Sequence, residues 1–170
     1  MTIWKGVAVG FLVALLFLAF GAWLFFGMGL APVATASDPM PFETYLAHRG
    51  LKAVVHRASA TPSPVEPNET NLKAGAALYR MNCAVCHGLP GLPASAISLG
   101  MFPKPPQLFK GKGVTDDPVG ETFWLVRNGI RLSGMPGFRD SLSDTEMWQV
   151  SQLLAHAGKL SDDVKSELHP

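Results

Sequence analysis

The run Cys83-Ala84-Val85-Cys86-His87 constrains this chain of 170 residues more than any other feature. Cysteines three positions apart on one helical turn point the same way, so both thiols can reach one planar group. The histidine that follows places an imidazole beneath that group. This spacing is the attachment signature of a c-type haem. The sequence therefore predicts one covalent haem c bound through Cys83 and Cys86, with His87 as an iron ligand.

Other interpretations of the Cys-x-x-Cys spacing need residues that the chain lacks. A thioredoxin-like redox pair belongs in a βαβ context, and no alternating strand pattern is present. A zinc site needs a second pair of Cys or His ligands. Cys83 and Cys86 are the two cysteines of the whole sequence, which excludes four-cysteine zinc ligation and structural disulfides with other positions.

The amino-terminal part predicts a membrane helix, because residues 7–30 carry no charge and roughly 20 apolar residues cross a bilayer. Trp4 and Lys5 precede this stretch, which places the amino end in the cytoplasm. A cleaved signal peptide is the alternative, and the small residues 34–36 resemble a cleavage site, but a signal core spans only about 7 to 15 residues. We expect residues 1–30 to be a single-pass anchor in the bacterial inner membrane, with the haem domain on the periplasmic side.

The charges of the chain balance. It has 14 basic and 13 acidic residues, and Lys5 stands before the apolar stretch, so the exported part carries no net formal charge. Such a balance gives no electrostatic footprint for nucleic acid. The sign of the charge also does not identify a redox partner.

Residues 31–70 are rich in proline, which predicts a periplasmic stalk. Within it, residues 42–57 mix apolar and basic side chains and predict a short surface or partner-docking helix. His48 and His56 lie in this helix. We interpret both as solvated, because no cysteine or carboxylate cluster accompanies them.

The remaining sequence predicts an all-α domain over residues 71–158. Capping residues, apolar spacing and terminal glycines indicate helices at 71–83, 117–129 and 143–158. The third begins with a capping box, Ser-x-x-Glu, at residues 143–146. A short tail, residues 159–170, follows the domain.

The second axial position of the iron decides the chemistry, because methionine makes an electron carrier and an open site permits ligand binding or peroxide chemistry. Met135 lies in a loop rich in glycine, and the proline after it disfavours helix, so its thioether can reach the distal face. Met101 also lies in a loop and remains an alternative, although the chain from His87 to it is short. Met81 is too near the attachment site, and Met147 fits the apolar face of the last helix. We favour Met135.

Three further side chains carry N–H donors suited to the propionates of a haem: Trp124, Arg127 and Arg131. The alternative is that Trp124 belongs to the core and that the arginines are solvated.

The order of these features resembles the class I c-type cytochromes, and most closely the bacterial membrane-tethered monohaem type. The resemblance covers about residues 71 to 157. It rests on Gly75-x-x-x-Tyr79-x-x-x-Cys83-x-x-Cys86-His87, Pro105-Pro106-Gln107-Leu108, Met135-Pro136 and a last helix with Trp148.

The resemblance implies a helical fold around one haem and roles for individual residues. Gly75 and Tyr79 would cross the last helix. The carbonyl of Pro106 would hold the free imidazole N–H of His87, and Leu108 would pack on the haem edge. The same resemblance makes Met135 the sixth ligand.

We expect a single-electron carrier without substrate turnover. A quinol-oxidising complex or a dehydrogenase would be the donor, and a terminal oxidase or another cytochrome would be the acceptor. Two alternatives remain: a permanent haem-bearing subunit of a larger respiratory complex, and an open-site haem sensor or peroxidase, which requires that Met135 does not bind iron.

Overall fold

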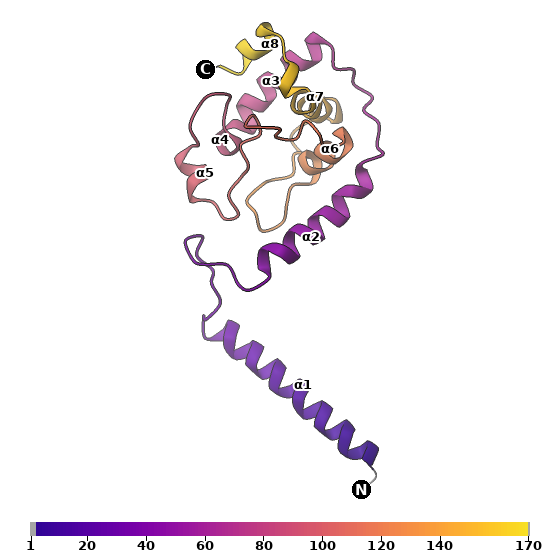
Figure 1. Ribbon diagram of the computed structural model, residues 1–170, viewed down its shortest axis with the longest axis vertical. Helices are drawn as coiled ribbons and strands as arrows, with labels where there is room; N and C mark the ends of the chain where they lie inside the picture. The colour runs from indigo at the N-terminus through magenta and orange to yellow at the C-terminus, as the bar shows by residue number, and fades with distance from the viewer. Residues whose placement is uncertain (1–2, 170) are drawn as a thin grey trace. The chain divides into compact units, whose positions relative to one another are not determined.

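The computed structural model describes residues 3–169, and within them the chain forms helices and loops without a β-strand (Figure 1). The all-α prediction is confirmed for this part of the chain. Residues 1–2 and 170, which the predicted anchor and tail include, lie outside the described residues. The chain divides into two compact units, one up to Pro41 and one from Phe42 onward.

The first unit contains α1 (Ile3–Gly27), a helix of 25 residues. At 1.5 Å per residue it is about 38 Å long, which exceeds the roughly 30 Å of a bilayer's hydrocarbon core. Most of its large apolar side chains are exposed in the structure. By length and composition α1 can cross a membrane, a test that a signal sequence near the amino end also passes.

The second unit is built from short helices. In chain order they are α2 (Glu43–Val55), α3 (Glu69–Asn82), α4 (Ala84–His87), α5 (Ala96–Gly100), α6 (Val119–Asn128), α7 (Asp144–Ala155) and α8 (Asp162–Glu167). Two 3-10 turns, η1 (His56–Ala58) and η2 (Ala157–Lys159), follow α2 and α7.

The helices α3 and α7 cross at Gly75, where the two backbones come unusually close. A Cβ atom at this position would lie 2.3 Å from the carbonyl oxygen of Gln149 and 3.2 Å from Cβ of Leu153. Only glycine allows this approach without moving one backbone away from the other. The crossing positions α3, whose carboxyl end carries Cys83.

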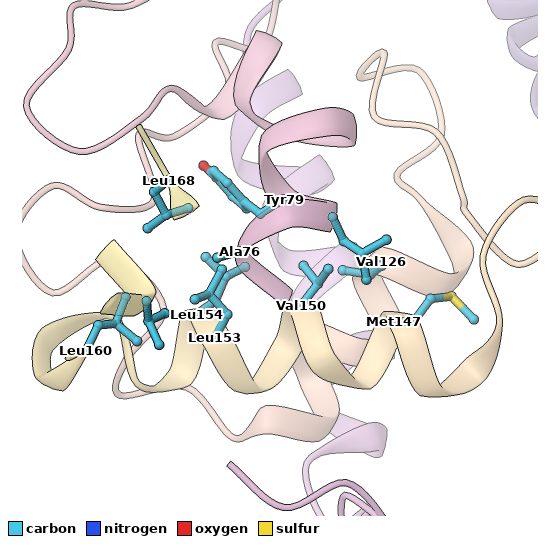
Figure 2. Packing of buried hydrophobic residues seen from close by; sticks show 11 residues of the cluster. Ala76, Tyr79, Val126, Met147, Val150, Leu153, Leu154, Leu160 and Leu168 are labelled. Carbon is cyan, nitrogen blue, oxygen red and sulfur yellow. The ribbon is translucent and has the colours of Figure 1, made fainter. Parts of the chain in front are cut away.

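The hydrophobic core lies where α3, α6, α7 and α8 meet, and Figure 2 shows how its side chains pack. Met147 is fully buried, which confirms that it belongs to the core. Tyr79 is also fully buried, and its hydroxyl group donates a hydrogen bond of 2.8 Å to the carbonyl of Gly88. Because each fully buried large apolar side chain stabilises the fold by about 1.5 to 3 kcal/mol, this cluster is the main source of stability.

The ends of α3 and α7 are capped by side chains. The predicted capping box at α7 is confirmed: the Ser143 hydroxyl accepts from Glu146 N, and the Glu146 carboxylate accepts from Ser143 N at 2.7 Å. At α3 the cap is Asn68, whose side chain accepts from the backbone N–H of Asn71 at 3.0 Å. This helix begins earlier than predicted, because Asn68 as well as Asn71 has a side chain suited to an N-cap.

Part of the predicted stalk belongs to the second unit. Val55 at the end of α2 is buried, and Nδ1 of His56 lies 3.2 Å from Oε1 of Glu121 on α6. The backbone packs closely here as well, since a Cβ at Gly120 would lie 2.3 Å from the carbonyl oxygen of Ala58. The chain from Phe42 onward is therefore attached to the helical domain. His56 is exposed as expected, but it is paired with a carboxylate.

The residues expected to form a tail contribute to the core. Leu160, Val164 and Leu168 are buried, and α8 packs against α3. The domain boundary predicted at residue 158 therefore differs from the structure. The apolar positions 160, 164 and 168 recur every four residues, which is the spacing of one helix face.

Candidate haem site

The Cys-x-x-Cys-His run forms a single helical turn at the end of α3. The backbone N–H groups of Cys86 and His87 both donate to the carbonyl of Cys83, at 3.1 and 2.9 Å. Gly88, with φ of 74°, ends this turn. The left-handed conformation suits glycine, and a Cβ there would lie 2.0 Å from Oε1 of Gln107. The turn brings the two thiols and the imidazole to one place.

Cys83, Cys86 and His87 line a cleft that encloses about 660 Å³ of empty space, open solvent included. Met101 and Met135 line the same cleft. The structure therefore brings together the attachment residues, the predicted iron ligand and both candidate methionines.

The imidazole of His87 is oriented by a backbone carbonyl. Its Nδ1 lies 2.9 Å from the oxygen of Pro106, and because a carbonyl can only accept, Nδ1 carries the proton. The lone pair is then on Nε2, which is free to bind a metal. Burial lowers the pKa of His87, and the hydrogen bond to Pro106 opposes this shift. The ring is thus held neutral, the form in which histidine binds iron.

The two cysteines are partly buried. Burial, and to a smaller extent Cys86, raises the pKa of Cys83 to about 12. Redox-active Cys-x-x-Cys pairs have lowered pKa values instead. The pKa of Cys83 thus differs from that of the thiols in such redox pairs. In addition, the described part of the chain contains no group of three or more His, Cys, Asp or Glu placed to hold a metal ion.

Met135 lies in the loop that follows α6. An isolated bridge joins Ile130 and Met135, in which Ile130 N donates to the Met135 carbonyl at 3.1 Å. The N–H of Met135 donates to the Ser133 hydroxyl at 3.2 Å. These bonds fix the backbone on both sides of the methionine. Met101 comes from another segment, directly after α5.

The structure places the other predicted site residues in different surroundings, some in the cleft lining and some outside it. Pro106 lines the cleft, whereas Leu108 packs against the hydrophobic core. Trp124 is partly buried on α6 and is not among the residues that line the cleft. Arg131 is exposed and also lies outside the lining, and Arg127 forms an ion pair with Asp144.

Several lining residues were not singled out from the sequence. Val126, Ile130 and Phe138 are apolar, and nothing in a helical pattern separates a side chain that faces a cofactor from one that faces the core. Lys104 also lines the cleft. Its position between Pro103 and Pro105 indicated a loop residue, since prolines on both sides keep a residue out of a helix.

The donor set of this cleft suits a haem. Two thiols stand one helical turn apart, a neutral imidazole offers Nε2, and two thioethers line the same space. Thioether, imidazole and thiol groups are the ligands and attachment points of c-type haem. The cleft has a mostly apolar lining, as a porphyrin requires.

Comparisons with known proteins agree with this geometry. A family model described as cytochrome C oxidase, cbb3-type, subunit III matches residues 70–154, which is half of the 170-residue chain. The chain is also similar to the quinohemoprotein alcohol dehydrogenase ADH IIB of Pseudomonas putida, with 30% identity over 96 residues. That stretch is 55% of this chain and 12% of the dehydrogenase, so the chain matches only a small part of that protein.

Proposed function

This chain belongs to the family of cytochrome c oxidase, cbb3-type, subunit III, and we propose that it passes single electrons between redox proteins at the periplasmic face of a bacterial inner membrane. A c-type cytochrome domain implies haem binding and electron transfer. The observation that carries the proposal is the one cleft shared by Cys83, Cys86, His87 and Met135. In this proposal the chain turns over no substrate of its own.

Five residues of the cleft have separate roles in the proposal. Cys83 and Cys86 would hold the porphyrin by thioether bonds, and His87 and Met135 would bind the iron. The bound haem supplies an iron centre that cycles between ferrous and ferric states. Pro106 fixes the orientation of the His87 ring. The Met135 thioether favours ferrous iron and so raises the reduction potential.

The proposal includes α1 as a retained single-pass anchor, with a cleaved signal sequence as the alternative. Its support is a helix of 25 residues, which is longer than the core of a signal peptide. Protein sequencing of the amino end of the mature chain decides between the two. An amino end at or after residue 34 contradicts the anchor.

The partners proposed are a quinol-oxidising complex or a dehydrogenase as donor, and a terminal oxidase or another cytochrome as acceptor. The family description favours a second candidate, a permanent haem-bearing subunit of an oxidase complex. Both have the same chemistry and differ in the partner. Extraction in mild detergent followed by gel filtration separates them, because stable co-migration with other subunits contradicts a freely tethered carrier.

The ligation is tested by optical absorption of the purified, haem-loaded protein. We expect a weak far-red band in the oxidised form that is lost in Met135→Ala, and no carbon monoxide shift in the reduced form until Met135 is removed. Met81→Ala is the matched control, since Met81 is 67% exposed and is not in the cleft lining. A wild-type protein that binds carbon monoxide readily contradicts the ligation and favours an open-site sensor or peroxidase.

A further inference from the structure

Met101 and the loop of Met135 are in direct contact inside the cleft. Both methionines line it, and a Cβ atom built on Gly134 would lie 2.8 Å from Cε of Met101. Gly134 therefore presents only hydrogen atoms to the terminal methyl group of Met101. Because Gly134 directly precedes Met135, this contact lies one residue from the proposed iron ligand.

The loop of Met135 is strained near this point. Leu132 has φ of 63° and Gly134 has φ of 80°, both in the left-handed region. Leucine rarely adopts this conformation, and the side chain of Leu132, at 94% exposed, gains no packing in return. A strained segment keeps its conformation only when surrounding contacts hold it.

The hydrogen bonds of the loop hold it from within. Ile130 N donates to the Met135 carbonyl, Ser133 N donates to the Ile130 carbonyl at 3.3 Å, and Met135 N donates to the Ser133 hydroxyl. All three bonds join residues of the loop itself. The contact with Met101 comes instead from the segment after α5, so it ties the loop to another wall of the cleft.

We propose that Met101 is a positioning residue, whose methyl group braces Gly134 and thereby holds the Met135 thioether over the iron. This inference rests on the proposed function, in which Met135 is the sixth ligand. An unbranched thioether side chain is suited to the task, because it fills an irregular gap and reaches the glycine with its terminal methyl group. Met101 itself does not bind the iron in this arrangement.

The test uses the full-length, haem-loaded protein in detergent, with the far-red band of the oxidised form and carbon monoxide binding of the reduced form as readouts. Carbon monoxide binds only where Met135 has left the iron, so its apparent affinity reports the fraction of detached protein. We expect Met101→Ala to raise this fraction about tenfold and to weaken the far-red band. Met101→Leu keeps an apolar group of similar volume, but its shorter, branched side chain lacks the terminal methyl group that reaches Gly134, so it is expected to fall between wild type and Met101→Ala.

Gly134→Ala changes the other residue of the same contact. The new Cβ displaces the methyl group of Met101, so this variant is also expected to detach Met135 more often. Because both changes act at one contact, the double variant with Met101→Ala should show less than the product of the two fold-changes. Gly91→Ala is the control for backbone strain alone, since Gly91 has φ of 73° and open space around it.

The outcomes separate this inference from the proposed ligation. A wild-type protein without the far-red band overturns both. A normal wild type with unchanged Met101→Ala, or with strictly multiplicative effects in the double variant, overturns the positioning role and leaves the ligation intact. A methionine band that survives in Met135→Ala and is lost when Met101→Ala is added shows that Met101 is a ligand, which also overturns the inference.

Discussion

Replacing Gly75 by alanine should separate α3 from α7. The added Cβ meets the carbonyl oxygen of Gln149 at 2.3 Å, so the backbones must part by about 1 Å to reach an ordinary contact. Overpacking costs about 1 to 3 kcal/mol, and the obstacle here is backbone, which cannot turn aside as a side chain can. Alanine is more favourable than glycine in a helix interior, which offsets about 1 kcal/mol of this cost. Because a backbone obstacle places the cost at the upper end of that range, about 3 kcal/mol, we expect a net loss of about 2 kcal/mol in the free energy of unfolding.

Urea unfolding of the haem-loaded protein, followed by far-ultraviolet circular dichroism, measures this loss. With a slope of about 2 kcal/mol per molar urea, the midpoint should fall by about 1 M. Gly50→Ala is the matched control, because Gly50 lies inside α2 and a Cβ there meets nothing within 4 Å. That variant should be as stable as wild type or more stable. If Gly75→Ala behaves like the control, the close crossing is not what fixes α3 on α7.

Three other substitutions test the core, the docked segment and the loop. Leu168→Ala removes a fully buried side chain and should lower stability by about 3 kcal/mol; a loss well below 1 kcal/mol in thermal unfolding would place Leu168 outside the core. Gly120→Ala should push the chain at Ala58 away from α6, so trypsin should cleave after Arg57 faster than in wild type, and an unchanged rate would contradict the docking. Leu132→Gly relieves a left-handed leucine that is 94% exposed and should raise stability by up to about 1 kcal/mol; urea midpoints at or below wild type would refute the strain.

Local patterns predicted the elements that depend on neighbouring residues. The capping box at Ser143 and the burial of Met147 follow from the spacing of side chains along one helix. The Cys-x-x-Cys-His turn likewise needs only five consecutive residues. Such features are fixed by hydrogen bonds and contacts between positions three or four apart, which the sequence displays directly.

Features that depend on distant partners were not predictable in the same way. Proline-rich sequence suggested a stalk up to residue 70, but Val55 is buried and the backbone at Ala58 packs closely against Gly120 on α6, so this part lies on the domain. The C-terminal residues were predicted to be a tail because they contain few apolar positions. Those positions become buried only by packing against α3. The sequence left Met101 and Met135 as rivals, and the structure places both in one cleft.

The order of the core along the chain has a consequence for synthesis. The helix α3 leads into Cys83, yet its partner α7 begins only at Asp144. At about 5 to 20 residues per second, the thiols emerge roughly 3 to 12 seconds before α7 begins to appear. During that interval nothing from α7 or α8 covers α3, and the burial that raises the pKa of Cys83 to about 12 is not yet in place. The nascent chain thus exposes both thiols before the core closes around α3.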